Sequence, residues 1–96
     1  MSKVAVIIIN YNTYQKTKKC IDILRENTTV DYHIYLLDNG SKNESLHELK
    51  RYYEEAEDVT LIASEENLGY ARGNNKLLQR AIQDESQFAV IMNNDI

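Results

Sequence analysis

The sequence contains no proline and only three glycines, so few positions favour sharp turns. Gly40 follows a strand-like segment, and Gly69 and Gly73 lie in the polar stretch 64–73. No linker, low-complexity stretch or internal repeat interrupts the 96 residues. The chain is therefore expected to form one small domain around one modest core.

A single cysteine, Cys20, excludes an internal disulfide, and its apolar neighbours predict a buried structural thiol. The longest apolar run, residues 4–9, is far shorter than the ~20 residues that span a bilayer. Asn10, Tyr11 and Asn12 follow it, whereas a signal peptide would end in small residues. We therefore expect a cytoplasmic protein without a transmembrane segment, or the cytosolic face of a larger protein that acts near a membrane.

The net charge of −4 offers no basic stripe, which argues against nucleic acid as a partner. The acidic residues cluster at 54–58 and 65–66, where solvated surface is the simplest interpretation. His33 and His47 have no neighbours at metal-ligand spacing, and no serine, histidine and aspartate set is evident. A hydrophobic fraction of 43% fits a folded domain.

Strand-like and helix-like segments alternate along the chain. Short β-branched or apolar runs predict strands, and apolar residues at helical spacing predict helices. Ser41 and Glu44 fit a capping box before the second helix, and Thr13 could cap the first. The predicted strands cover 4–9, 33–37, 59–63 and 88–92, and the helices cover 14–27, 46–56 and 71–82. This alternation predicts an α/β fold with a parallel sheet.

Polar side chains follow each predicted strand. They come from Asn10 and Asn12, from Asp38 and Asn39, from Glu66 and Asn67, and from residues 93–95. Parallel sheets of this kind bind ligands at the carboxyl ends of their strands. The four polar strand ends therefore predict a binding site at one rim of the sheet.

Three local motifs at this rim each have two interpretations. Asp38 could accept hydrogen bonds from a base or ribose, or could form a turn with Gly40. The loop 67–75 enters a helix and could bind phosphate with help from Arg72, or could be structural. Asp95 could ligate Mg²⁺ or Mn²⁺ if substrate phosphates complete the shell, or could end a polar turn.

Taken together, these segments resemble family 2 glycosyltransferases with the GT-A fold. Residues 4–12 resemble the opening strand of that family, 38–41 its second-strand motif, and 93–96 its metal motif. Residues 67–75 are similar to the loop and helix of the rhamnosyltransferase-like branch. Pattern and resemblance predict a three-layer αβα fold, Rossmann-like, with a mostly parallel sheet in the order 3-2-1-4.

The resemblance implies a role for each motif in binding a nucleotide-diphosphate sugar. Asp38 would contact the base, and Asp95 would hold the divalent metal, Mg²⁺ or Mn²⁺, on the diphosphate. Asn93 stands where many relatives carry an additional aspartate. The implied substrate-binding residues are Asn10, Tyr11, Asn12, Asp38, Asn67, Gly69, Arg72, Asn74 and Asn93.

The family's acceptor site and catalytic base follow the metal motif, whereas this sequence stops at Ile96. We therefore expect a truncated glycosyltransferase domain that has no transferase activity alone. An alternative is a noncatalytic interaction module, and the apolar fourth strand predicts a homo-oligomer in either case. A nucleotidyltransferase would be expected to carry a glycine-rich basic loop after the first strand, where this chain has Asn-Tyr-Asn-Thr.

Overall fold

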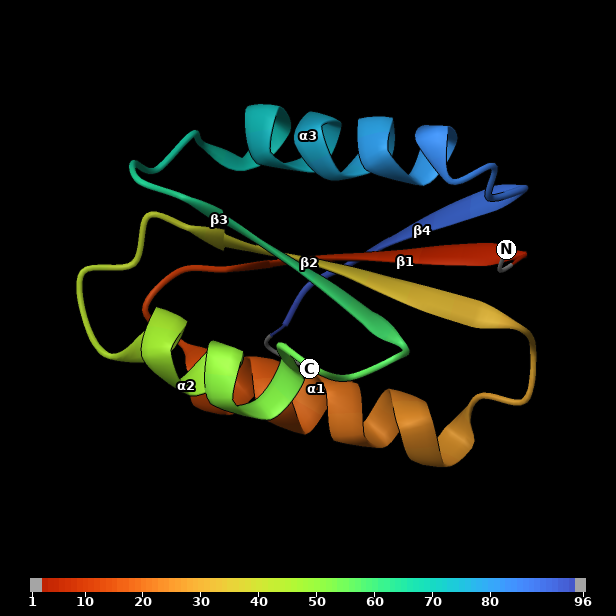
Figure 1. Cartoon of the computed structure of the whole chain (residues 1–96), viewed down its shortest axis with the longest axis horizontal. Coiled ribbons are helices and arrows are strands. Elements are labelled where there is room, and N and C mark those ends of the chain that lie inside the picture. Colours follow the sequence, from red (N-terminus) through yellow and green to blue (C-terminus); the bar gives the residue numbers. More distant parts are fainter. Residues whose placement is uncertain (1–2, 95–96) are drawn as a thin grey trace.

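In a computed structural model of the protein, the structure describes residues 3–94. Four strands alternate with three helices along this part of the chain (Figure 1). The elements are β1 (Val4–Asn10), α1 (Tyr14–Asn27), β2 (Tyr32–Asn39), α2 (Ser45–Tyr53), β3 (Val59–Ser64), α3 (Tyr70–Gln83) and β4 (Phe88–Met92). No helix in this range is long and apolar enough to cross a membrane.

The four strands form one sheet in the order β3-β2-β1-β4, and all three strand pairs are parallel. The predicted α/β fold, parallel sheet and strand order are therefore confirmed. β1 and β2 occupy the centre, and their side chains are largely buried on both faces. This burial explains why β1 is a continuous run of β-branched and small apolar residues.

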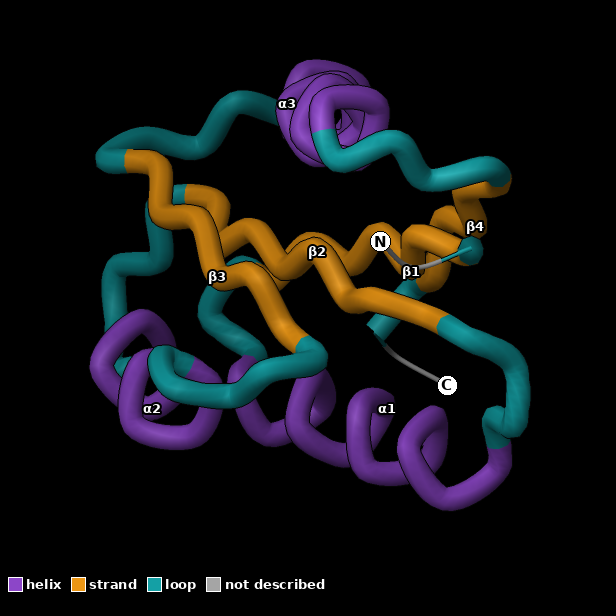
Figure 2. The backbone as a smooth tube through the Cα atoms, turned by 45° about the vertical axis from the view of Figure 1, so that its right-hand side comes forward, coloured by secondary structure: helices purple, strands orange, loops and turns teal. Residues whose placement is uncertain are grey.

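Helices cover both faces of the sheet and give three layers. α1 and α2 lie on one face, and α3 lies alone on the other (Figures 1 and 2). The core below α1 and α2 is the larger one, and Cys20 belongs to it, as the sequence predicted. The core below α3 contains Ala5, Ile7, Tyr35, Leu37, Leu77 and Ala81.

The start of α2 differs from the prediction. The residue before the helix is Glu44, whose side chain makes no capping hydrogen bond, so the proposed capping box is wrong. Ser41 instead donates its hydroxyl to Asp38 Oδ1. The backbone amide of Ser45 donates to the side-chain oxygen of Asn43. The Ser41 hydroxyl is bonded to Asp38 and to the backbone amide of the distant Asn12, and it does not cap the helix.

Two further local expectations need correction. Thr13 precedes α1 as predicted, but its hydroxyl does not cap the helix and bonds to neighbouring side chains instead. Ile82 follows the apolar spacing that predicts a helix over 71–82, yet it is 72% exposed. α3 lies over the centre of the sheet, and only Leu77 and Ala81 in its second half are fully buried.

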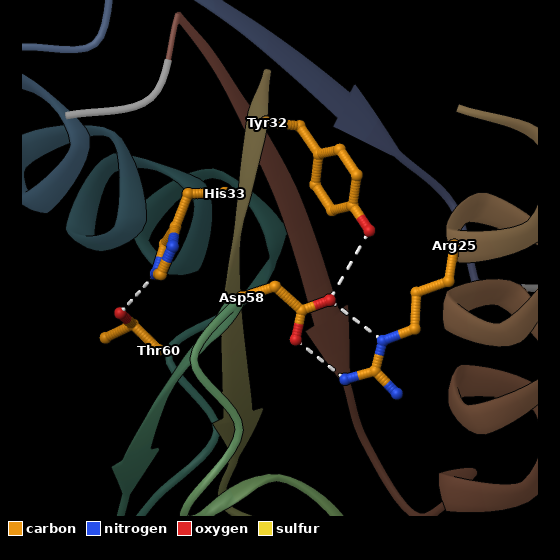
Figure 3. A network of polar contacts seen from close by, with 5 residues as sticks. All are labelled: Arg25, Tyr32, His33, Asp58 and Thr60. Carbon is orange, nitrogen blue, oxygen red and sulfur yellow. Dashed lines mark hydrogen bonds and ion pairs between the residues drawn. The ribbon is translucent and has the colours of Figure 1, made fainter. Parts of the chain in front are cut away.

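A polar network joins α1, β2 and β3 at the amino ends of the strands (Figure 3). Arg25 makes a two-pronged ion pair with Asp58, with both N···O distances at 2.8 Å. The Arg25 guanidinium holds the pKa of the Asp58 carboxyl below its usual value. Nearby, His33 Nε2 lies 2.7 Å from Thr60 Oγ1. These contacts stabilise the end of the sheet opposite the predicted site.

β4 is an edge strand that remains largely uncovered. Phe88, Val90 and Ile91 are each at least 46% exposed, and the five residues of β4 include no charge and no proline. An apolar groove of about 340 Å³ runs between α1 and this edge. Its walls include Val4, Val6, Cys20, Ile23, Leu24, Val30, Tyr32, Val90 and Met92.

Candidate functional site

A buried set of hydrogen bonds connects the carboxyl ends of β1, β2 and β4. Asn10 Nδ2 donates to Asp38 Oδ1 at 3.0 Å, and Asn10 Oδ1 accepts from the Thr17 hydroxyl at 2.7 Å. The Asn94 amide nitrogen donates to both Thr13 and Thr17 at 2.9 Å. We call this set the strand-end network; its members are Asn10, Thr13, Thr17, Asp38, Ser41 and Asn94.

Asp38 is turned into this network. The side chain is 1% exposed, and its Oδ1 accepts from Asn10 and, at 2.6 Å, from the Ser41 hydroxyl. Its Oδ2 accepts only a 3.3 Å bond from the Ser41 backbone amide. Oδ2 is therefore the oxygen with capacity left for a ligand, and its hydrogen-bond donor among the described residues is the Ser41 backbone amide.

The loop after β1 is held against the loop after β2. The backbone amide of Asn12 donates to Ser41 Oγ, and Asn12 Oδ1 accepts from the Lys42 backbone amide at 2.7 Å. Asn12 has a φ of +57°, a backbone conformation that asparagine tolerates better than most residues. Asn12 therefore serves to join two loops, and its side-chain oxygen is occupied by protein.

The loop after β3 is fastened to β2 by Asn39. Asn39 Oδ1 accepts from the Leu68 backbone amide at 2.8 Å, and its Nδ2 donates to Asn67 Oδ1 and to the Gly69 carbonyl. Gly40 sits against the same loop, because a Cβ built there would lie 2.4 Å from the Glu66 carbonyl carbon. The end of β2 and the loop after β3 therefore contact each other, and together with the joined loops after β1 and β2 they form one connected rim.

A cleft of about 400 Å³ opens above this network, at the carboxyl ends of β1 and β4. We call it the rim cleft. Tyr11 and Asn93 contribute to its walls, and Tyr70 lines it from the start of α3. The lining residues are Ile9, Tyr11, Thr13, Lys16, Tyr70, Met92, Asn93 and Asn94. The cleft combines two tyrosine rings, amide groups and one lysine, and contains no acidic side chain among the described residues.

The electrostatic character of the rim cleft favours an anion. α1 and α3 both start at this rim, and neither has an acidic residue in its first turn. The positive ends of the two helix dipoles therefore point to the cleft. Lys16 lies in the first turn of α1, where the dipole disfavours a cation, and it forms no ion pair within residues 3–94. Among the described lining residues, Lys16 is the one charged side chain, and its charge has the same sign as the helix N-termini.

The residues predicted to bind substrate separate into groups. Tyr11 and Asn93 line the rim cleft, whereas Asn10 and Asp38 lie buried beneath it. The others fall outside the cleft: Asn12, Asn67 and Gly69 hold the loops, Arg72 is exposed on α3, and Asn74 is buried under α3. Asn74 Oδ1 has no hydrogen-bond partner among the described residues.

The predicted metal ligand Asp95 lies outside the described residues. Within residues 3–94, no three histidine, cysteine, aspartate or glutamate side chains form a metal site. The adjacent described residues Asn93 and Asn94 both line the cleft and carry amide oxygens. Oxygen donors suit Mg²⁺ and Mn²⁺, and such ions often bind through one carboxylate and substrate phosphates. The donor chemistry beside Asp95 therefore fits the expected ion.

Sequence reasoning missed Lys16 and Tyr70 as cleft residues. Both lie in the first turn of a helix that follows a strand carboxyl end, so their placement at the rim could have been found. A lysine at a helix N-terminus, where the helix dipole disfavours a positive charge, was the sequence feature that could have identified Lys16 as a candidate cleft residue. Thr17 follows the apolar spacing of the predicted helix 14–27, and that spacing did not predict its two side-chain partners.

Solved structures share this fold. A mannosyltransferase, PcManGT from Pyrobaculum calidifontis, in complex with GDP-Man and Mn²⁺, superposes with a TM-score of 0.80 at 22% identity. TarS 1–349 of S. aureus superposes with a TM-score of 0.79 at 20% identity, and a second TarS structure is in complex with UDP. The alignments cover 98% and 97% of this chain and 28% and 27% of those chains.

Sequence comparison identifies the family. The model for glycosyl transferase family 2 matches residues 5–96, which is nearly the whole chain. No curated protein matches significantly. The chain belongs to glycosyl transferase family 2, as the resemblance of its motifs implied, and it spans about a quarter of the length of the solved structures to which it is similar.

Proposed function

We propose that these 96 residues bind the nucleotide-diphosphate part of a donor sugar for transfer to an acceptor hydroxyl. The rim cleft carries this proposal, because it holds Lys16, is lined by two tyrosines and lies where parallel sheets bind ligands. The family match and two neighbours, one with GDP-Man and Mn²⁺ and one with UDP, support the same ligand class.

Lys16 and the two helix N-termini are suited to the diphosphate. Backbone amides at helix starts bind phosphate, and a lysine adds a mobile positive charge. Tyr11 and Tyr70 offer flat faces on which a base or sugar ring can stack. Asp38 can receive a base N–H on Oδ2 once Ser41 moves aside.

Mg²⁺ or Mn²⁺ would be held by Asp95, with Asn93 beside it and phosphate oxygens completing the shell. The ion would stabilise the negative charge that develops on the departing diphosphate. Among the described residues, the chain's own contribution is to fix Asn94 through Thr13 and Thr17, and to present Asn93 to the cleft.

Transfer also needs a base that accepts the proton of the acceptor hydroxyl. No described carboxylate or histidine lines the rim cleft, so we assign donor binding and not turnover to these residues. Incubation with a nucleotide sugar, Mn²⁺ and a simple acceptor should yield no product. Product formation that depends on Asp95 would overturn this assignment.

Calorimetry with UDP, GDP and dTDP tests donor binding. The expected dissociation constant is on the order of 0.1–1 mM, since one domain encloses only part of a ligand. Lys16→Gln should weaken binding about threefold to tenfold, because one charge contact is lost. Lys19→Gln, a charge-matched control on the same helix outside the cleft, should leave affinity unchanged. Equal effects of the two substitutions would refute a role for Lys16.

A second candidate function is self-association through β4. The unpaired edge has apolar side chains on both faces and none of the charges or prolines that protect exposed edges. A second copy in antiparallel orientation would place Val90 against Val90 and Phe88 against Met92. We propose this homodimer because the pairing is self-complementary and extends both apolar faces of the sheet.

Light scattering across a dilution series tests the homodimer. Val90→Lys should shift the protein toward monomer without unfolding it, since Val90 is already 47% exposed. Ile82→Lys is the matched control, because Ile82 is an exposed isoleucine on α3 and outside β4. A monomeric wild-type protein at high micromolar concentration would contradict the proposal.

Two finer assignments complete the proposal. The loop 67–75 is similar to the rhamnosyltransferase-like branch, which would make a deoxysugar nucleotide a sensible ligand to test beside UDP and GDP. A cytoplasmic location, expected from the sequence, stays a prediction that cell fractionation would check.

A further inference from the structure

The proposed site has one wall that the sheet holds only weakly. β4 ends at Met92 on the exposed edge, and Asn93 and Asn94 follow it along the rim cleft. Pairing between β1 and β4 extends only to Ile8 and Met92, so no ladder hydrogen bond fixes the next two residues. Among the described residues, the contacts that place this wall are a long 3.9 Å bond from the Cys20 thiol to the Asn93 carbonyl and two 2.9 Å bonds from the Asn94 side chain. The Asn94 side chain therefore makes the shorter and more numerous of these contacts.

Asn94 is held from below by α1. Its amide nitrogen donates to the Thr13 and Thr17 hydroxyls at 2.9 Å each. Thr17 is fully buried and in turn donates to Asn10 Oδ1 at 2.7 Å, whereas the matching Thr13 contact is 3.5 Å. Thr17 is thus the stronger of the two connections between Asn94 and the end of β1.

The connection continues to the other side of the site. Asn10 is fully buried and donates to Asp38 Oδ1, and Asp38 accepts from Ser41, whose hydroxyl also accepts from the Asn12 backbone amide. Hydrogen bonds therefore run without interruption from the end of β4, through Thr17, to the loops that follow β1 and β2. Each bond is 3.0 Å or shorter along this route.

The position of Thr17 on α1 also favours more than a packing role. The other buried residues of this helix are Cys20, Ile21 and Leu24, which contact the core. An aliphatic residue at position 17 would extend that apolar face, but it would leave Asn10 Oδ1 with only the long Thr13 bond. A buried hydroxyl with one donor and one acceptor partner fixes both partners in one arrangement.

We propose that Thr17 is a positioning residue of the donor site: it fixes Asn93 and Asn94 relative to Asp38, so that both sides of the site are set before ligand binds. This inference rests on the proposed function for its effect on affinity. The arrangement itself exists in the ligand-free protein and can be measured without any nucleotide.

The test compares Thr17→Val, which keeps the shape but removes the hydroxyl, with Thr17→Ser, which keeps the hydroxyl. Thr60→Val is the control, because Thr60 loses a comparable side-chain bond, to His33, at the opposite end of the sheet. The ligand-free readout is the Asn94 side-chain NH₂ signal by NMR. Its protection from hydrogen exchange should fall in Thr17→Val only.

The second readout is affinity for UDP and GDP. We expect Thr17→Val to weaken the tighter-binding nucleotide at least fivefold, and Thr17→Ser and Thr60→Val to stay within twofold of wild type. Asn94→Ala, near the end of the chain, should reproduce the loss if Thr17→Val does not fold.

If Thr17→Val folds and the Asn94 side chain keeps its protection from hydrogen exchange, the inference is overturned. If Thr17→Val does not fold, an unchanged nucleotide affinity in Asn94→Ala overturns it. Equal losses of affinity in Thr17→Val and Thr60→Val would also overturn it, because the effect would then follow stability alone. If wild-type protein bound no nucleotide, the proposed function would fail, and the Asn94 signal would still decide the positioning role.

Discussion

Gly40 offers the most direct test of how the rim is assembled. Its φ of +74° is strained for any residue with a side chain, and its Cβ position lies 2.4 Å from the Glu66 carbonyl carbon and 2.5 Å from the Asn67 amide nitrogen. Both obstacles are backbone atoms, which cannot rotate away. Gly40→Ala therefore requires the loop after β3 to move away from β2.

The expected loss of stability has two parts. The left-handed backbone costs an alanine about 1–2 kcal/mol, and inserting a methyl group into a filled space costs about 1–3 kcal/mol. Gly69→Ala is the control without the steric clash, because Gly69 has nothing within 4 Å of its Cβ position, although its φ of +80° and ψ of 168° lie in a region that essentially only glycine adopts. It should show the backbone strain alone, about 1–3 kcal/mol.

Urea denaturation followed by circular dichroism would measure both variants. We expect Gly40→Ala to be less stable than Gly69→Ala by at least about 1 kcal/mol, or about 4–8 °C in melting temperature for a domain of this size. Equal stabilities would mean that the loops after β2 and β3 do not meet at Gly40, and the description of a connected rim would be wrong.

Three further predictions follow from groups outside the cleft. The Asp58 pKa lies below its usual 3.8, so its ion pair with Arg25 stabilises the fold fully above pH 3.8 and progressively less as the pH falls below that value. The urea midpoints of Arg25→Met and wild type should therefore converge toward pH about 2. Burial lowers the pKa of His33 below 6.5, so folding opposes its protonation. NMR should show that the His33 ring titrates below pH 6.5. The wild-type protein should lose stability below pH 6.5, whereas His33→Gln should not show this loss. Burial also raises the pKa of the Cys20 thiol; Ellman's reagent should react at least about tenfold more slowly with native than with unfolded protein, and equal rates would contradict the buried position.

The fold was predictable because its signals are local. β4 was predicted with its observed bounds, and the alternation of strands and helices predicted the parallel sheet. The start of α2 was not predictable from the Ser41 and Glu44 pattern, because Ser41 bonds to Asp38 and to the distant Asn12. The same serine could have capped a helix, but in the folded protein its hydroxyl bonds to other groups.

The site was predictable as a region but not residue by residue. Polar strand ends located the rim, and Tyr11 and Asn93 do line the cleft. The sequence could not show that Asp38 is enclosed, because its partner Asn10 lies 28 residues away in the chain. It also could not show which face of α1 carries Thr17 toward Asn94, a contact across 77 residues.

The central claim is that the rim cleft binds the nucleotide-diphosphate part of a donor. Titration of isotope-labelled protein with UDP, GDP and dTDP, followed by amide NMR shifts, tests it most directly. We expect saturable shifts for Tyr11, Lys16, Tyr70 and Asn93, with smaller changes at Val30 in the apolar groove. No shifts at saturating nucleotide, or shifts confined to the apolar groove, would contradict it.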